Sequence, residues 1–306
     1  MMDLRTAPPS ATNVCAVVVA YYPDEGFETR LERVLPQVAM LLIVDNTPEG
    51  GFLSESFQRK WAETLYFIGN HANKGVAIAL NQGLDFAAKR GCPWLLTLDQ
   101  DTHCYPNMVS ILSKAYAQCE KAPAVIGANY LDRQNHRIKV KTQSKMEYVV
   151  QKTVITSGCL VDVSIAMSIH GFREDYFIDQ VDHEFCLRIR SVGKQVVITS
   201  QPAMEHAVGQ SGGAWIPLLG ILPNHPPIRK YYIARNTLVT VAQYWRIEPV
   251  WCAKRLIRLF LGLLEMALLE RHRLRKVHAF FAGIVDGVRQ RMGICQKVWL
   301  QQQAQE

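Results

Sequence analysis

A nine-residue stretch, residues 94–102, limits what this chain can fold into more than any other part of its sequence. It begins with a short apolar run and ends with two carboxylates, Asp99 and Asp101. A continuous apolar run of this length is typical of a strand buried on both faces of a parallel sheet. Ligands bind beyond the carboxyl ends of such strands. We therefore expect Asp99 and Asp101 to flank a ligand-binding crevice.

Two acidic side chains at one strand end favour a divalent cation. Mg²⁺ and Mn²⁺ prefer hard oxygen ligands and are commonly held by one or two carboxylates together with the phosphates of a substrate. The alternative is that Asp99 caps the following turn and Asp101 is simply solvated. An Asp-x-Asp pattern alone does not separate these interpretations, so the rest of the chain has to decide.

The composition is that of an ordinary globular protein. With 306 residues, 49% of them hydrophobic, the chain can form one large or two medium domains. Its eight cysteines show no Cys-x-x-Cys spacing, which favours neither a zinc site nor a disulfide framework and fits a reducing compartment. Residues 1–13 are polar, lack the apolar core of a secretory signal and are expected to form a flexible leader.

Alternating strand and helix patterns fill the first hundred residues. Apolar, often β-branched runs at residues 14–20, 41–44 and 65–68 predict buried strands, and helices are expected over 27–38 and 76–89. Right-handed crossovers bring the carboxyl ends of such strands to one edge of the sheet. Four side chains that follow the strands should line this edge: Tyr21, Asp45, Asn70 and Asp99.

A second candidate ligand-binding feature precedes the helix at residues 76–89. Gly75 allows close backbone approach, the first amides of a helix lack intrahelical partners, and Lys74 after Asn73 adds positive charge. This combination suits a diphosphate group. A plain loop with a solvated lysine is the alternative.

The middle of the chain continues the pattern with a helix expected over residues 106–120 and a polar, basic surface excursion over 132–147. Residues 153–163 predict a strand in which Gly158 would mark close passage of a ligand or of backbone. Cys159 has no neighbouring histidine or catalytic motif and is interpreted as a small core residue.

Two further polar residues stand at the borders of predicted elements. Asp182 lies at or near the start of a helix whose apolar face contains Phe185, Ile189 and Val192. It is therefore an N-cap, a base with one oxygen directed at a substrate, or both. His206 comes after the strand predicted at 195–199, and it is either structural or completes a metal site.

The C-terminal part carries most of the net charge of +7. Residues 250–306 contain ten Lys or Arg against four Asp or Glu, whereas residues 1–249 contain 24 against 23. Charged residues interrupt every long apolar run between 251 and 287, so a membrane-spanning helix is not expected. Two interpretations stay open: a helix on the inner membrane surface, or a helical hairpin packed on the catalytic domain. The Gly- and Pro-rich residues 210–228 predict a loop that would suit a lid.

The order of these segments resembles the family 2 glycosyltransferases, and more narrowly their bacterial rhamnosyltransferase branch of O-antigen and related polysaccharide biosynthesis. The resemblance covers about residues 14–245. It is carried by residues 18–21 (VVAY), 44–46 (VDN), 73–75 (NKG) with Asn81 and Gly83, 98–101 (LDQD), 157–158 (SG), 177–179 (FID), 181–188 (VDHEFCLR), His206, and 231–232 (YY) with Arg235 and Asn236.

This resemblance implies an α/β protein with the GT-A (Rossmann-like) fold, a mixed, mainly parallel sheet flanked by helices, and a C-terminal helical extension. It also implies inverting transfer of a sugar from a nucleotide sugar, most specifically dTDP-rhamnose. Tyr21 would bind the donor, Asp45 would contact its base or ribose, and Asn73 with Lys74 would lie near the nucleotide.

The remaining roles also come from the resemblance. Asp99 and Asp101 would be the metal motif for Mg²⁺ or Mn²⁺, Asp101 as the more direct ligand, and His206 would join through the diphosphate-bound cation. Asp182 would be the general base. The Glu-Asp pair of many relatives reads Val-Asp at residues 181–182. On the acceptor side, Asp179 and Glu184 are the alternative candidates for the base.

The predicted chain has three parts: a flexible leader at residues 1–13, a GT-A catalytic domain at 14–245 and a basic amphipathic helical extension at 246–306. The acceptor implied is a saccharide or a lipid-linked saccharide, and the expected location is the cytoplasm, with a peripheral position on the inner face of the cell membrane as an open alternative. No nucleic-acid partner is expected, and the sequence is compatible with an oligomer.

Two other functions share parts of this pattern. A sugar-phosphate nucleotidyltransferase also uses a doubly wound sheet and carboxylate-bound Mg²⁺. It usually begins with a Gly-rich, basic loop after the first strand, whereas residues 21–25 are acidic and lack glycine. A non-catalytic, membrane-associated GT-A scaffold would not need the ordered acids Asp45, Asp99, Asp101 and Asp182, which are all present. The sequence therefore favours a glycosyltransferase.

Overall fold

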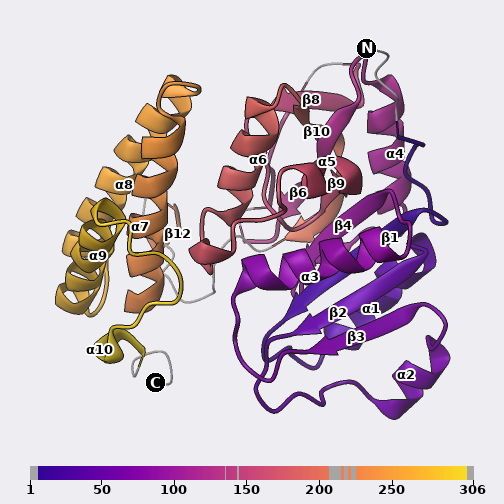
Figure 1. Ribbon diagram of the computed structural model, residues 1–306, viewed down its shortest axis with the longest axis horizontal. Coiled ribbons are helices and arrows are strands. Elements are labelled where there is room, and N and C mark those ends of the chain that lie inside the picture. The colour runs from indigo at the N-terminus through magenta and orange to yellow at the C-terminus, as the bar shows by residue number, and fades with distance from the viewer. Residues whose placement is uncertain are drawn as a thin grey trace. The chain divides into compact units, whose positions relative to one another are not determined.

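The computed structural model describes residues 6–134, 136–142, 145–206, 215–216, 220–221 and 225–301. The chain divides into two compact units (Figure 1). The sheet unit comprises Met1–Arg173 and Phe185–Val208, and the helical unit comprises Glu174–Glu184 and Gly209–Glu306. The helical unit thus includes residues 174–184 and 209–245 in addition to the predicted extension at 246–306. The assignment of 14–245 as the catalytic domain stays a prediction.

The described strands of the sheet unit form one ten-stranded sheet. Parallel strands in the order β3-β2-β1-β4 make up one half, followed by β9, β6, β10 and β5, while β7 pairs with β6 and β8 with β10. Because β9 alone of the central strands runs antiparallel to its neighbours β4 and β6, the mixed, mainly parallel sheet is confirmed. The bounds are β1 Val14–Ala20, β2 Met40–Asp45, β3 Leu65–Gly69, β4 Trp94–Asp99, β5 His103–Cys104, β6 Pro123–Asp132, β7 Arg137–Ile138, β8 Tyr148–Gln151, β9 Cys159–Asp162 and β10 Gln195–His206.

The α-helices described with these strands are α1 Phe27–Val34, α2 Glu55–Lys60, α3 Val76–Lys89, α4 Met108–Gln118, α5 Val163–Ser168 and α6 Val181–Ser191, of which residues 181–184 belong to the helical unit. The α3 helix has the predicted bounds and packs on β1, β2 and β4 (Figure 1). The helix expected over 27–38 ends at Val34 and continues as a 3₁₀ turn, Leu35–Gln37, because Pro36 lacks the amide hydrogen that an α-helix needs.

Gly158 precedes β9 instead of lying within it. Its φ of +73° belongs to the left-handed region, and a Cβ there would come within 2.6 Å of the Met204 sulfur and 2.9 Å of the Ala128 Cβ. The close approach is therefore that of core side chains. Cys159 is buried, as expected, and all eight cysteines are free thiols.

The helical unit contains α7 Pro227–Tyr244, α8 Pro249–Leu269, α9 Arg273–Val288 and α10 Val298–Gln301, together with a 3₁₀ turn at Glu174–Tyr176. Two short strands, β11 Trp215–Ile216 and β12 Gly220–Ile221, pair antiparallel. The other residues of the predicted lid up to position 224 lie outside the described residues. Among the helices described, none is both long and apolar enough to cross a membrane.

Candidate functional site

The strand register brings the predicted polar edge together. In the parallel half of the sheet, Ala20 lies opposite Asp45, Val19 opposite Asp99, and Asp45 opposite Gly69. The residues that end or follow these strands therefore share one edge, as the sequence predicted. Tyr21 is exposed there.

Asp99, Asp101 and His206 form a cluster at this edge that could hold a metal ion. An Asp99 carboxylate oxygen lies 3.9 Å from Nε2 of His206, and an Asp101 oxygen lies 3.9 Å from Nδ1. One ligand atom from each residue falls within 4.8 Å of the others. The three residues come from the end of β4, the turn after it and the end of β10, so strands far apart in the chain build the cluster.

The cluster fits a divalent cation chemically. The Asp99 and Asp101 side chains are 42% and 53% exposed, whereas the His206 side chain is 10% exposed. Nδ1 of His206 is buried and makes no hydrogen bond to any described residue. A buried, unpaired imidazole nitrogen is costly unless a ligand satisfies it. Two carboxylates open to solvent would leave coordination positions for phosphate oxygens.

Three further side chains hold the turn between these acids: Gln100 and Ser157, which lie in the motifs that carry the resemblance, and Arg30, to which the sequence analysis gave no role. The side-chain oxygen of Gln100 accepts a hydrogen bond from the backbone N–H of Tyr21 (2.6 Å), and its side-chain nitrogen donates to the backbone carbonyl of Tyr21 (3.1 Å). These two hydrogen bonds tie the end of β1 to this turn. Nε of the buried Arg30 donates to the Gln100 carbonyl (2.7 Å). The Ser157 hydroxyl accepts from the Asp99 amide (3.2 Å). The sequence pattern does point to a buried role for Arg30, because it is a cation among the apolar residues that α1 buries.

Asp45 is fully buried at the same edge. One of its carboxylate oxygens accepts a hydrogen bond from the Thr47 amide at 2.7 Å. The other oxygen is buried and has no hydrogen-bond partner among the described residues. An unpaired buried carboxylate oxygen is a strong acceptor for an N–H or O–H group of a ligand.

The segment before α3 forms a tight turn. The Asn73 side chain accepts a hydrogen bond from the Gly75 amide (3.0 Å), and Gly75 has a φ of +87° that favours glycine. Lys74 is exposed. Two asparagines at the strand ends support this turn: Asn46, to which the sequence analysis gave no separate role, donates to the Gly75 carbonyl (3.2 Å) and accepts from the Asn70 side chain (2.8 Å).

The candidate base and its two alternatives belong to the helical unit and have different environments. Asp179 pairs with Arg229 at 3.3 Å, and burial raises the pKa of its carboxyl group against the opposing effect of Arg229. Glu184 is buried and accepts a hydrogen bond from the Tyr244 hydroxyl at 2.9 Å. Both acids are engaged in holding the structure.

Asp182 is the second residue of α6 and is partly exposed. Its side chain accepts a hydrogen bond from the adjacent His183 amide at 2.7 Å. The carbonyl oxygen of Gln180 accepts a hydrogen bond from the backbone N–H of Glu184 (2.9 Å). Gln180 therefore occupies the N-cap position of α6, and Asp182 lies two residues after it. Val192, expected on the buried face of this helix, is exposed, since α6 ends at Ser191.

The backbone before α6 is strained. Phe177, Asp179 and Gln180 have φ values of +66°, +63° and +65°, a region that residues with side chains rarely adopt. Each such residue costs about 1–3 kcal/mol and persists only where surrounding contacts enforce it.

Arg235 and Asn236 of α7 supply those contacts. The buried Asn236 amide donates to the carbonyls of Tyr176 (3.0 Å), Ile178 (2.8 Å) and Asp179 (3.0 Å). The buried Arg235 guanidinium donates to the carbonyls of Asp175 (3.1 Å) and Tyr176 (3.2 Å), and Arg235 also donates to the Asn236 side chain (2.9 Å). We refer to these two residues as the carbonyl clamp. The segment that positions Asp182 is thus held by a helix some 60 positions later in the chain.

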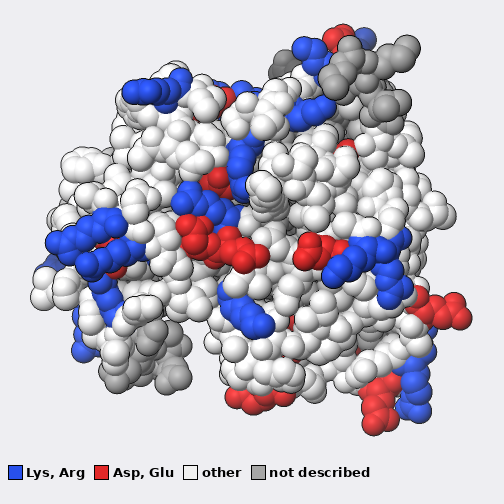
Figure 2. Space-filling view, viewed as in Figure 1, with Lys and Arg blue, Asp and Glu red and all other residues white. Residues whose placement is uncertain are grey.

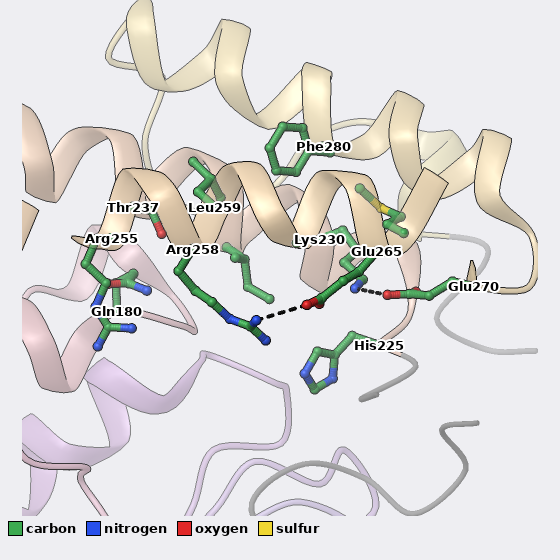
Figure 3. A pocket seen from close by; sticks show the side chains of 13 residues that line it. Gln180, His225, Lys230, Thr237, Arg255, Arg258, Leu259, Glu265, Glu270 and Phe280 are labelled. Atoms are coloured by element: carbon green, nitrogen blue, oxygen red, sulfur yellow. Dashed lines mark hydrogen bonds and ion pairs between the residues drawn. The ribbon is translucent and has the colours of Figure 1, made fainter. Parts of the chain in front are cut away.

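A cavity of about 180 Å³ within the helical unit reaches Gln180 (Figure 3). Oε1 of Gln180 and Nδ1 of His225 are buried and make no hydrogen bond to described residues. Arg255, which also lines the cavity, donates to Nε2 of His183, beside Asp182. Burial lowers the pKa of Arg255, while the charge of Asp182 raises it. The cavity therefore offers both donors and acceptors next to the segment that carries Asp182.

Comparison with known proteins agrees with this architecture. No family model matches the chain. The sequence is 27% identical over 245 residues to the dTDP-rhamnosyl transferase RfbF of Shigella flexneri, covering 74% of this chain and 79% of that protein. The fold matches S. aureus TarS 1-349 with a TM-score of 0.57 at 11% identity, over 91% of this chain and 82% of that one.

A structure of GalNAc-T7 with UDP, GalNAc and Mn²⁺ matches with a TM-score of 0.56 at 13% identity, over 79% of this chain. The chain spans half the length of that protein. These structural matches show that the chain described here has the GT-A glycosyltransferase fold. In this GT-A fold the sheet edge, the acidic turn after β4 and the C-terminal helices all correspond to the expectation from the sequence.

Proposed function

We propose that this protein is a metal-dependent glycosyltransferase that transfers rhamnose, with inversion, from dTDP-rhamnose to a hydroxyl group of a saccharide or lipid-linked saccharide. The observation that carries the proposal is the cluster of Asp99, Asp101 and His206, with its unpaired buried nitrogen, at the carboxyl edge of a GT-A sheet. The similarity to a dTDP-rhamnosyl transferase supports the choice of donor.

Within this proposal, the chain binds the donor at the sheet edge. The unpaired Asp45 oxygen accepts a hydrogen bond from the base or ribose, and the exposed Lys74 beside the start of α3 attracts the diphosphate. Asp99, Asp101 and His206 would hold Mg²⁺ or Mn²⁺, which supplies positive charge to the departing diphosphate.

The reaction breaks the bond between the anomeric carbon and the diphosphate oxygen and forms a bond from that carbon to the acceptor oxygen. Asp182 takes the proton of the acceptor hydroxyl, because it is the acid in its segment that is neither ion-paired to Arg229, like Asp179, nor bonded to Tyr244, like Glu184. The cavity beside Gln180 binds part of the acceptor, since sugar hydroxyls need both donors and acceptors.

A panel of nucleotide sugars tests this function. The protein is incubated with each donor, an acceptor mixture and Mg²⁺ or Mn²⁺, and release of nucleoside diphosphate is followed. We expect release from dTDP-rhamnose that requires the cation and is abolished in Asp101→Asn, but not in the matched control Asp85→Asn, an exposed aspartate of α3. Release of pyrophosphate from a nucleoside triphosphate and a sugar phosphate would instead identify a nucleotidyltransferase.

A further inference from the structure

The helices α7 to α10 direct their acidic side chains inward. The Glu270 side chain is 6% exposed and lies between Lys230 (2.5 Å) and Lys276 (2.6 Å). Asp286 is buried, and it accepts hydrogen bonds from the Tyr231 hydroxyl (2.9 Å) and pairs with Lys297 (2.9 Å). Each of these acids is neutralised inside the unit and contributes no negative charge to its surface.

The other two acids between residues 225 and 301 are also withdrawn from solvent. Glu248 is buried, and the Glu265 side chain is 19% exposed and pairs with Arg258 at 3.0 Å. In contrast, eight cations in the same range are exposed: Arg246, Lys254, Arg258, Arg271, Arg273, Arg275, Arg289 and Arg291. The surface of these helices, over the residues described, is therefore positively charged without an exposed acid. Figure 2 shows Lys and Arg side chains gathered where α9 lies in Figure 1.

Exposed apolar side chains lie between these cations in two helical stripes. In α8 five of them recur at intervals of seven, four, three and four residues, Val250, Ile257, Leu261, Leu264 and Leu268, and Phe260 and Leu269 are exposed beside them. In α9 they recur at intervals of seven, four and three: Leu274, Phe281, Val285 and Val288. Leu268 is 71% and Leu274 is 81% exposed. Stripes with this spacing occupy one face of each helix.

The buried faces of both helices point to α7. Met266 of α8 and Phe280 of α9 pack in one apolar cluster with Ala234 of α7. The exposed stripes are therefore on the faces turned away from this cluster. An amphipathic helix that combines large apolar side chains with flanking Lys and Arg is the type that lies in a lipid interface.

We propose that the α8–α9 surface binds an anionic lipid membrane. A second copy of the chain is disfavoured as the occupant, because it would bring the same exposed cations together without opposing acids. Nucleic acid would use the cations but would leave the aliphatic stripes without a partner. An anionic lipid surface matches both features, and the inference does not depend on the proposed sugar transfer.

Sedimentation with vesicles tests the inference on the full chain. Binding to vesicles of equimolar phosphatidylcholine and phosphatidylglycerol is compared with binding to phosphatidylcholine alone, at low and high salt. We expect binding to the anionic vesicles that weakens with salt. Arg275→Gln should weaken it about fivefold, since one cation near an anionic surface contributes about 1 kcal/mol. Leu268→Ser should weaken it about tenfold through lost apolar burial.

Matched variants on the sheet unit control for general effects of charge and hydrophobicity. Lys89→Gln and Val150→Ser change exposed residues and should leave vesicle binding unchanged. Equal binding to both vesicle types, or no binding at low salt, would overturn the proposal. So would a concentration-dependent dimer, measured by analytical ultracentrifugation, that Leu268→Ser dissociates. Donor-dependent release of nucleoside diphosphate without lipid reports separately on the proposed function.

Discussion

At the scale of single residues, three acids close together in sequence have separate fates. Asp179 is paired with Arg229 and Glu184 with Tyr244, whereas Asp182 accepts only the amide of its neighbour His183 among the hydrogen bonds described. If Asp182 is the base, Asp182→Asn should slow transfer about 10²- to 10⁴-fold and leave donor affinity unchanged. Asparagine retains an oxygen for the His183 amide, so the fold should persist. Initial rates and calorimetric titration with donor measure the two effects.

Two comparisons make this prediction specific. Asp85→Asn is the isosteric control and should retain full activity. Asp179→Asn and Glu184→Gln should lower the free energy of unfolding, because each weakens a buried contact. Transfer by Asp182→Asn within about tenfold of the wild type would exclude Asp182 as the base.

At the scale of elements, the carbonyl clamp links α7 to the strained segment before α6. Asn236→Ala would remove the donor to three carbonyl oxygens and leave the left-handed residues without their support. We expect a loss of about 1–3 kcal/mol in the free energy of unfolding and a lower kcat, while the KM for the donor, whose site we propose in the sheet unit, stays the same.

The matched control for this prediction is Asn107→Ala. It removes an exposed asparagine of the sheet unit whose side chain makes no capping hydrogen bond to α4, so stability and kcat should both stay at the wild-type level. An unchanged kcat in Asn236→Ala would show that the clamp does not position the base.

At the scale of the whole molecule, the stability should depend on pH through His225. Burial and the nearby cations lower the pKa of His225 to about 3, compared with about 6.5 in an unfolded chain. Between these pH values His225 binds a proton more tightly in the unfolded chain than in the folded protein, so a falling pH favours unfolding. The stabilising contribution of neutral His225 is complete above about pH 6.5 and is lost as the pH falls toward about 3. The slope is at most about 1.4 kcal/mol per pH unit and smaller here, because the ring is partly exposed.

Urea unfolding at several pH values, with circular dichroism as the signal, measures this slope. His225→Gln should flatten it, and His71→Gln, an exposed histidine of the sheet unit, should not. Burial raises the pKa of Asp179, so Asp179 contributes to the pH dependence of stability with the opposite sign. This contribution is present in both the wild type and His225→Gln, and the difference between the two proteins therefore isolates His225. Parallel pH profiles for His225→Gln and the wild type would contradict the expectation.

The parallel strands and the acidic edge could be predicted because their information is local. Apolar runs, the turn residues after them and the handedness of crossovers place Asp45 and Asp99 on one edge without knowledge of any distant contact. The GT-A fold was expected from the family resemblance that the order of the motifs carries, and the comparison with solved structures shows it. The same reasoning placed Asp182 near a helix start, because helical periodicity is visible in residues 185–189.

What the sequence pattern could not show were pairings between distant side chains and backbone groups. Only the folded chain brings such partners within bonding distance. Examples are Asn236 with the carbonyls that it holds, Gln100 with Tyr21, and Glu270 between Lys230 and Lys276. The count of charges near the C-terminus was known, but the side chains that face solvent were not. Folding withdraws the four acids described between residues 225 and 301 from solvent and leaves eight cations of the same range exposed, because a withdrawn carboxylate needs a partner inside the protein whereas a lysine or arginine can extend its charge into water.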